Sequence, residues 1–301
     1  MLLTFCWRRE GFVLSRSNTR EGGGPHHRCR ELDDVRQAKP GTEGSGARFA
    51  QMSVLIGTAG WSIPRDIAHR FPTNGSALER YAAILPVAEI NSSFHRSHRI
   101  ATWERWRDSV PEDFRFSVKL PKQVTHERKL IDCESDVELF LSDVETLGEK
   151  LAVLLVQLPP KLMFNATVTQ RFFAALSKRT KVAIACEPRH LSWFGEEAGT
   201  LLAQLGVARV GSDPAICDAA AIPGGWVELS YWRLHGSSIV YRSSYLDRID
   251  AYAAKLSREV SKRRDVWCIF DNTASSAGAS DALALQDLLT GQRIVASVEE
   301  E

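Results

Sequence analysis

Charged and polar side chains recur in this sequence at the ends of short apolar segments. In the segment 231–235, Arg233 and His235 alternate with Trp232 and Leu234. Residues i and i+2 of a strand share a face, so Arg233 and His235 would lie on the same side. The same spacing recurs in other segments, with Glu89 and Asn91, Ser117 and Lys119, Leu155 and Gln157, Glu187 and Arg189, and Asp271 at the end of the last one. Burying such side chains is costly unless they pair or bind something, so the pattern predicts a functional pocket or a buried ion-pair network.

The residue types in this set point to acid–base chemistry on an anionic molecule. Glu187 and His235 are typical proton-transfer groups, and Glu89 and Lys119 are further catalytic candidates. Lys119 and Arg233 would bind an anionic group of a substrate. Each residue also has a structural interpretation, in which the cations pair with the carboxylates and the histidine is a hydrogen-bonded core residue.

Further candidates for substrate binding come from strand ends and from the loops that follow them. His126 would line the opening of the site, although a surface histidine fits its position equally well. The substrate-binding candidates are Asn91, His126, Gln157, Arg189, His190, Arg233 and Asn272.

Eight apolar segments have the length and composition of strands and alternate with amphipathic segments. They cover residues 54–58, 87–91, 115–120, 151–157, 182–187, 207–211, 231–235 and 266–271. The pairs Ser76/Glu79, Ser135/Glu138 and Thr167/Gln170 are typical of capping boxes at helix starts. The alternation predicts parallel strands joined by right-handed crossovers, and eight units predict one (β/α)₈ TIM-type barrel. An open doubly wound sheet is the alternative, but Gly57–Trp61 lacks its glycine-rich spacing. Barrel enzymes place their sites at the carboxyl ends of the strands, where these residues would converge.

Composition divides the chain into three parts. Residues 1–51 carry nine Lys/Arg and six Asp/Glu, a net charge of +3, with no persistent helical or strand period. We expect this part to be a disordered or artefactual N-terminal extension, with Met52 as the natural start. Residues 52–296 would form the barrel and 297–301 an acidic C-terminal tail.

Charge and cysteine usage restrict the partners and the compartment. Residues 52–301 carry 29 Lys/Arg and 31 Asp/Glu, a net charge of −2, which makes a nucleic-acid partner unexpected. No apolar run is long enough to span a bilayer. The six cysteines form no metal-ligand spacing, and the cytoplasm is the expected location. The oligomeric state stays open.

Seven motifs resemble the YecE-like family of bacterial proteins, a domain of unknown function (number 72). They are GTAGW (57–61), EINSSF (89–94), FRFSVKLPK with TH (114–126), LLVQLPP (154–160), EPRHLSW (187–193), RLHG (233–236) and FDNT (270–273). Their order and spacing cover nearly all of 54–290. The resemblance implies a TIM-type barrel of unestablished activity. It also implies that the recurrent polar positions are Glu89, Asn91, Lys119, Thr125, His126, Gln157, Glu187, Arg189, His190, Arg233, His235 and Asn272.

Three functions remain open from the sequence. The first is an enzyme that uses acid–base chemistry on a small polar or anionic substrate, phosphorylated or sugar-like, with no cofactor. It could be an isomerase, lyase or hydrolase. The second is a metal-dependent phosphodiesterase or nuclease-like barrel, with a divalent metal held by Glu89, Glu187, Asp213, His235 and Asp271. The third is a non-catalytic ligand-binding sensor or scaffold.

Overall fold

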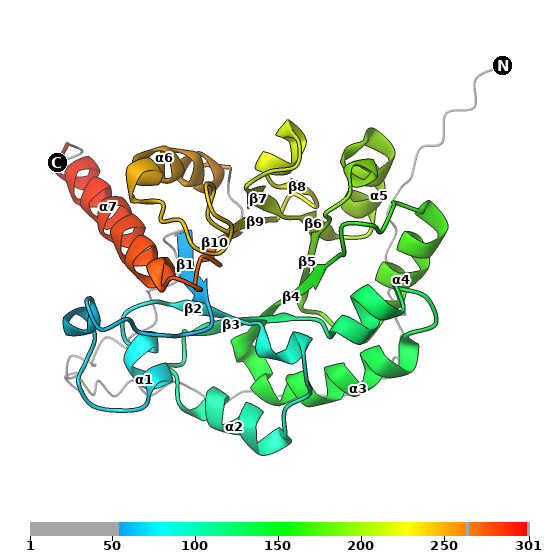
Figure 1. Ribbon diagram of the computed structural model, residues 1–301, viewed down its shortest axis with the longest axis horizontal. Helices are drawn as coiled ribbons and strands as arrows, with labels where there is room; N and C mark the ends of the chain where they lie inside the picture. Colours follow the sequence, from blue (N-terminus) through cyan, green and yellow to red (C-terminus); the bar gives the residue numbers. More distant parts are fainter. Residues whose placement is uncertain (1–53, 263–264, 300–301) are drawn as a thin grey trace, which may run out of the picture. The chain divides into compact units, whose positions relative to one another are not determined.

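Ten strands form one sheet in the described part of the chain, residues 54–262 and 265–299 of the computed structural model (Figure 1). The strands are β1 (Val54–Ala59), β2 (Val87–Ile90), β3 (Arg115–Lys119), β4 (Leu151–Gln157), β5 (Ala183–Glu187), β6 (Val207–Arg209), β7 (Gly211–Asp213), β8 (Gly224–Gly225), β9 (Leu229–Leu234) and β10 (Asp265–Phe270). The predicted N-terminal extension 1–51 and the last two residues of the predicted C-terminal tail lie outside this range.

The sheet closes into a ring. Its strand order is β7-β9-β10-β1-β2-β3-β4-β5-β6-β8, so β6 and β7 stand near opposite ends. Only Val210 separates β6 from β7 along the chain, so the segment 207–213 pairs with β5 through its first half and with β9 through its second. All pairings are parallel except that of β6 with the two-residue β8. Counted with 207–213 as one strand, the eight predicted strands are all present, and the predicted TIM-type barrel is confirmed.

Helices follow most of the strands and cover the outside of the barrel (Figure 1). They are α1 (Ala77–Ala82), α2 (Ile100–Asp108), α3 (Glu134–Val144), α4 (Ala166–Arg179), α5 (Glu196–Gln204), α6 (Ile249–Val260) and α7 (Ala277–Glu299). In the described residues, the segment after β7 contains only a short 3₁₀ helix, Asp218–Ala221, where a regular unit would have an α-helix. None of the described helices combines the length and the hydropathy of a bilayer-spanning segment.

One of the three predicted capping boxes is confirmed. At the start of α1, Ser76 accepts a hydrogen bond from the Glu79 amide, and the Glu79 carboxylate accepts one from the Ser76 amide. The other two predictions are wrong. Helix α3 begins one residue before Ser135, and α4 is capped by Asn165, whose Oδ1 accepts from Val168 N at 3.0 Å. In both cases the chain enters the helix earlier than the Ser/Thr signal indicates.

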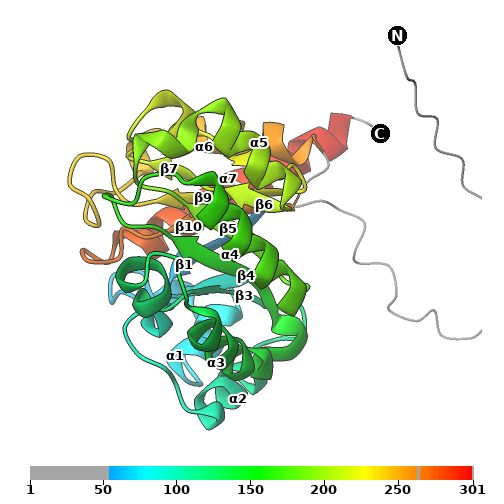
Figure 2. The ribbon, with the colours of Figure 1, turned by 90° about the vertical axis from the view of Figure 1, so that its right-hand side faces the viewer.

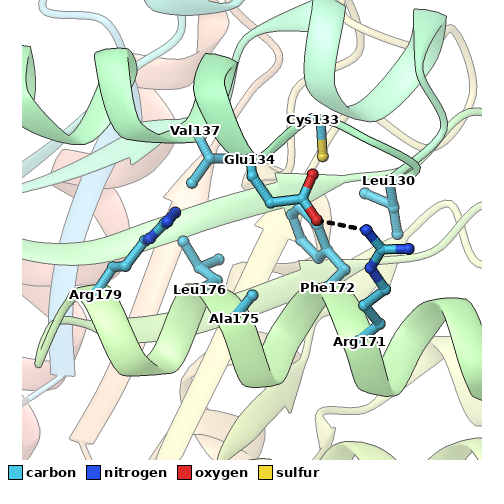
Figure 3. Close-up of a pocket in the computed structure, with 9 residues that line it drawn as sticks. All are labelled: Leu130, Cys133, Glu134, Val137, Arg171, Phe172, Ala175, Leu176 and Arg179. Atoms are coloured by element: carbon cyan, nitrogen blue, oxygen red, sulfur yellow. Dashed lines mark hydrogen bonds and ion pairs between the residues drawn. The ribbon is translucent and has the colours of Figure 1, made fainter.

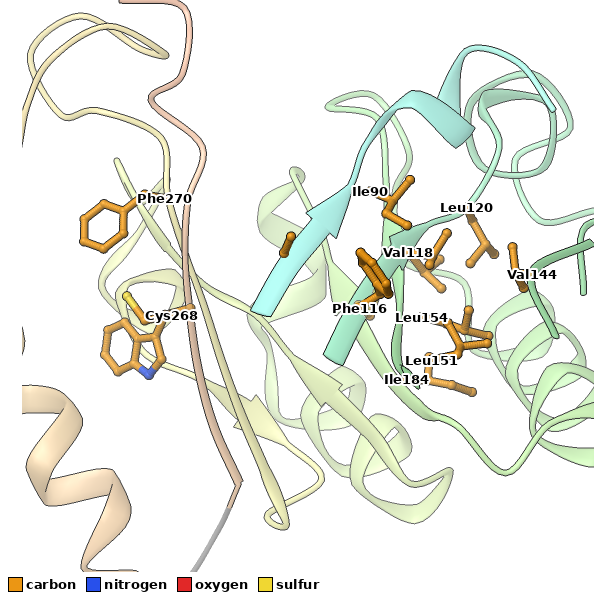
Figure 4. Close-up of a cluster of buried hydrophobic side chains, with 14 of the residues drawn as sticks. Ile90, Phe116, Val118, Leu120, Val144, Leu151, Leu154, Ile184, Cys268 and Phe270 are labelled. Atoms are coloured by element: carbon orange, nitrogen blue, oxygen red, sulfur yellow. The ribbon is translucent and has the colours of Figure 1, made fainter. Parts of the chain in front are cut away.

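The strands of the barrel, apart from the two-residue β8, bury both of their faces. One face packs against the helices, and Figure 4 shows Ile90, Phe116 and Val118 on this side. The other face fills the barrel interior with a second apolar cluster that includes Val153 and Leu155. Because strand residues alternate between the faces, the charged residues at the strand ends continue the interior face. The fold therefore brings them together at one end of the barrel.

Candidate functional site

Arg233 lies at the centre of a buried group of carboxylates at the carboxyl ends of the strands. Its Nε and Nη2 donate to the two oxygens of Glu89 at 3.0 and 2.7 Å. Its Nη1 donates to Glu187 Oε2 at 2.6 Å, and Nη2 also donates to Asp271 Oδ2 at 2.9 Å. Arg233, Glu89 and Glu187 are each at most 1% exposed. The guanidinium thus connects β2, β5 and β9 with the end of β10.

His235 bridges two of the same carboxylates. Its Nε2 lies 2.7 Å from Glu187 Oε1, and its Nδ1 lies 3.0 Å from Asp271 Oδ2. Carboxylates only accept hydrogen bonds, so a ring nitrogen that bonds one of them does so by donating its N–H. Arg189 Nη2 also approaches Glu187 Oε1, at 2.8 Å, and His235 Nε2, at 2.9 Å. Glu187 is therefore surrounded by three basic groups.

These charges keep Glu187 and Asp271 ionised. Burial alone would raise the pKa of Glu187, but Arg233, Arg189 and His235 outweigh it and hold that pKa well below its usual range. The pKa of Asp271 is likewise lowered, because Arg233 and His235 outweigh its burial. A carboxylate with so low a pKa is a weak base at neutral pH. The predicted role of Glu187 as the proton acceptor is therefore not the one that its surroundings favour.

Tyr231 and Ser117 form a neutral hydrogen-bonded pair beside Glu89 in the barrel interior. Tyr231 donates to Glu89 Oε2 at 2.9 Å and lies 2.8 Å from Ser117 Oγ. Burial and the neighbouring Glu89 charge raise the pKa of Tyr231 well above its usual value. We call Glu89, Glu187, Tyr231, Arg233, His235 and Asp271 the buried tier.

Lys119 lies above the buried tier and is half-buried. Its Nζ stands 4.2 Å from the centroid of the Phe94 ring, a cation–π contact. Among the described residues no carboxylate forms an ion pair with it. Burial, and then the charge of Arg233, lower the pKa of Lys119 to about 8. The amine thus titrates close to neutral pH, where it can both accept and donate a proton.

Five other predicted residues are half-buried as Lys119 is, and we call them, together with Lys119, the upper tier: Asn91, His126, Gln157, Arg189 and His190. His126 packs edge-on against Phe94 at 4.9 Å, and its Nδ1 lies 2.9 Å from Thr125 Oγ1. Burial and the Lys119 charge lower the pKa of His126. His190 Nδ1 accepts a hydrogen bond from Ser192 N and so caps a 3₁₀ helix, Leu191–Phe194. Asn91 contacts the buried tier through Nδ2, at 3.5 Å from Asp271 Oδ1.

Two polar atoms of the upper tier are buried without a partner among the described side chains. They are Asn91 Oδ1 and Arg189 Nε. Buried polar groups in proteins are nearly always hydrogen-bonded, and exceptions are found where a ligand or water binds. Together with the unpaired Lys119, these atoms indicate that the upper tier is the part of the cluster open to a ligand.

Asn272 is a predicted site residue whose hydrogen-bond partners lie outside both tiers. Its Nδ2 donates to Asp281 Oδ2 at 2.6 Å and to Ser243 O at 2.9 Å, and its side chain is fully buried. Asn272 therefore links the loop after β9 to the first turns of α7 through these two hydrogen bonds. Figure 2 shows that the loops after β9 and β10 lie on the same side of the barrel.

Phe94 and Tyr231 were missing from the predicted site. Tyr231 shares a strand face with Arg233, so the two-residue spacing could have found it. Phe94 lies in a short 3₁₀ helix, Ser92–Phe94, after β2, and no strand pattern extends to it.

The buried tier does not fit a metal ion. Arg233 occupies the space between Glu89, Glu187 and Asp271 and pairs with all three. Within residues 54–262 and 265–299, no three His, Cys, Asp or Glu side chains are arranged to hold a metal ion. A metal bound by this set would have to displace the guanidinium.

Together, the ring of parallel strands and the polar tiers at its carboxyl end define an α/β barrel of the TIM type with a cluster of charged and polar side chains at its mouth. Residues 55–301 match the family model described as "Protein of unknown function DUF72", and the chain belongs to this family. The resemblance inferred from the motifs is thereby confirmed.

Curated relatives match over part of their length. The UPF0759 protein YecE of Escherichia coli (strain K12) is 30% identical over 167 residues, which are 52% of this chain and 58% of that protein. The UPF0759 protein YunF of Bacillus subtilis (strain 168) is 29% identical over 149 residues, 47% of this chain and 52% of that protein. The matched segment thus spans only about half the length of these relatives.

Solved structures of family members share the fold. A DUF72 family protein from Enterococcus faecalis has a TM-score of 0.68 at 19% identity and covers 79% of this chain and 96% of its own. A DUF72 family protein from Thermotoga maritima has a TM-score of 0.65 at 23% identity, and the match covers 79% of this chain and 99% of that protein.

Proposed function

We propose that this protein is an enzyme that transfers protons to and from a small anionic substrate held by the upper tier at the barrel mouth. The observation that carries the proposal is the state of Lys119. Its amine is half-buried, unpaired among the described residues, and has its pKa lowered to about 8. A proton-transfer group works best when its pKa lies near the working pH.

The charge balance of the two tiers supports an anionic substrate. Three carboxylates lie in the buried tier, whereas two of the three Lys/Arg cations lie in the upper tier and give it a positive charge. The carboxylates are Glu89, Glu187 and Asp271, and the cations are Lys119, Arg189 and Arg233. A carboxylate or phosphate group bound beside Lys119 and Arg189 would offset that charge and satisfy the unpartnered Arg189 Nε.

The buried tier has a positioning role in this proposal. Arg233 is fully engaged by three carboxylates and is 1% exposed, so it acts on the substrate through its field rather than by contact. Glu187 and His235 hold Arg189 in place. In this proposal Lys119 alone transfers the proton, and the other three predicted catalytic residues, Glu89, Glu187 and His235, have positioning roles.

A hydrogen–deuterium exchange experiment tests the proposal without knowledge of the net reaction. The full chain is incubated in D₂O with anionic probes (pyruvate, glycolate, glucose 6-phosphate and ribose 5-phosphate) and with the uncharged sugars as controls, and the loss of C–H signals is followed by proton NMR. We expect exchange only with anionic probes, at a rate that rises with pH through about 8 because the free amine is the base.

Two variants make the result specific. Lys119→Met should abolish the exchange, whereas Lys178→Met, which removes an exposed lysine of α4, should leave it unchanged. Anion binding without exchange or turnover would refute the proposal and favour a non-catalytic sensor.

A further inference from the structure

An apolar groove lies beside the upper tier, between the loops that follow β3, β4 and β5. Its volume is about 170 Å³. It is lined by Lys129, Leu130, Ile131, Leu162, Met163, Asn165, Val168, Thr169 and Trp193. The three strands below it are those that carry Lys119, Gln157 and Glu187 at their ends.

The groove has a rigid base and an exposed apolar rim. Trp193 and Leu130 are 1% and 5% exposed, whereas Ile131 and Met163 are 49% and 64% exposed. Apolar side chains gathered around a concave surface are typical of a ligand-binding site. An apolar cavity of about 150 Å³ holds one benzene ring, so this groove has the size of a single aromatic or branched aliphatic group.

Short hydrogen-bonded connections join the groove to the upper tier. Leu130 N donates to Val124 O at 3.0 Å, within the π-helical turn Gln123–Glu127 that carries His126. On the other wall, Trp193 N donates to His190 O at 3.2 Å, and Trp193 Nε1 donates to Leu162 O at 2.9 Å. The walls of the groove therefore belong to the same loops as His126 and His190 of the upper tier.

The loop on the β3 side is held in an unfavourable conformation. Lys129, Leu130 and Asp132 have φ angles of 53°, 70° and 45°, in the left-handed region that non-glycine residues rarely adopt. Such backbone is energetically disfavoured and is concentrated at active sites and ligand clamps. Here it places Leu130 at the base of the groove and leaves Ile131 on its rim.

The adjoining pocket between α3 and α4 cannot take the same group. Leu130 also lines this pocket, which Figure 3 shows beneath the Arg171–Glu134 ion pair. Its volume is about 20 Å³, which is room for about one water molecule. An apolar ligand group therefore fits only on the Trp193 side of Leu130.

We propose that this groove is a subsite for an aromatic or branched aliphatic group of the substrate, whose anionic end lies at Lys119 and Arg189. The inference rests on the proposed function and names its substrate class: a small amphipathic anion. The apolar group and the anionic group of the substrate are then recognised by separate parts of the same loops.

A set of linked and unlinked probes tests the subsite in the full chain. Acetate represents the anionic end, toluene the apolar end, and phenylalkanoates from phenylacetate to 5-phenylpentanoate join the two at increasing distance. Affinities are measured by NMR titration. We expect one phenylalkanoate to bind at least tenfold more tightly than acetate, because one molecule then occupies both parts.

Three variants distinguish the apolar groove from the anion-binding residues. Met163→Glu should remove the gain over acetate and the binding of toluene, while Leu139→Glu, at a 63% exposed residue of α3 outside the groove, should change neither. Lys119→Met should weaken acetate and leave toluene bound.

The two proposals fail in different ways. If acetate binding depends on Lys119 but no phenylalkanoate exceeds acetate, or the gain survives Met163→Glu, the subsite is refuted and the proposed function stands. If toluene binds in the groove but Lys119→Met leaves every carboxylate unaffected, the anion site and the substrate class both fall.

Discussion

Lys119 should weaken the fold that carries it. Its pKa falls from 10.5 to about 8, which means that the folded protein disfavours the charged amine. That difference corresponds to about 3 kcal/mol at neutral pH. Replacing Lys119 by methionine removes this penalty and also a cation–π contact worth about 0.5–1 kcal/mol. We therefore expect Lys119→Met to raise the free energy of unfolding by about 2 kcal/mol at pH 7.

The pH dependence of the free energy of unfolding shows whether the increase in Lys119→Met comes from removing the lysine charge. Below pH 8 the lysine is protonated in both the folded and the unfolded chain, so the penalty is constant. Between about pH 8 and 10.5 the unfolded lysine keeps its proton while the folded one loses it, so the wild type gains stability relative to the variant as the pH rises. The difference between the two proteins should shrink over this range to near zero.

Urea unfolding of both proteins from pH 6 to 10.5, followed by circular dichroism, measures this difference. Lys178→Met serves as the control, and we expect no pH-dependent change for it. A Lys119→Met variant that is less stable at pH 7, or a difference that stays flat up to pH 10, would show that the amine is well paired and would remove the basis of its assigned role.

Three further outcomes follow from the packing of the site. Arg233→Met leaves three buried carboxylates without their shared cation and should cost about 3–5 kcal/mol in urea unfolding. Glu187→Gln should destabilise the protein at neutral pH, and the loss relative to wild type should disappear as the pH falls below 4.5 through the lowered pKa of Glu187, since that stability requires the ionised carboxylate. Gly57→Ala should lower the melting temperature sharply by calorimetry, because the added Cβ would lie 2.0 Å from Val87 O; an unchanged melting temperature would contradict the close approach of β1 and β2.

The sequence was sufficient to predict the strands and the face on which the polar residues lie. Both follow from local properties, because short apolar runs form strands and alternation assigns each side chain to a face. The same rule accounts for the residue that was misplaced. Asn272 comes one position after Asp271 and so points the other way, although its place at the start of the loop after the last strand made it a candidate.

The pairing of the charges could not be predicted. Glu89 and Arg233 are 144 residues apart, and their contact depends on which side chains meet across the closed ring. No local pattern distinguishes an arginine that binds substrate from one that three carboxylates already hold. The division of the sixth strand around Val210 is hidden for the same reason, since it reflects how β5 and β9 approach each other.

That divided strand also gives the ion pairs a mechanical role. The segment 207–213 joins β5 and β9 through three residue pairs on each side, whereas β9 and β10 share six. With so few paired residues on each side, this seam should open locally more readily than the β9–β10 pairing, which would be detected as faster amide exchange. Glu187 and Arg233 come from the two strands that flank it and bond directly at 2.6 Å. Their ion pair is a non-covalent cross-link over this joint of the barrel, so an amino-acid change that alters the charges at the mouth will also change how readily the ring opens here.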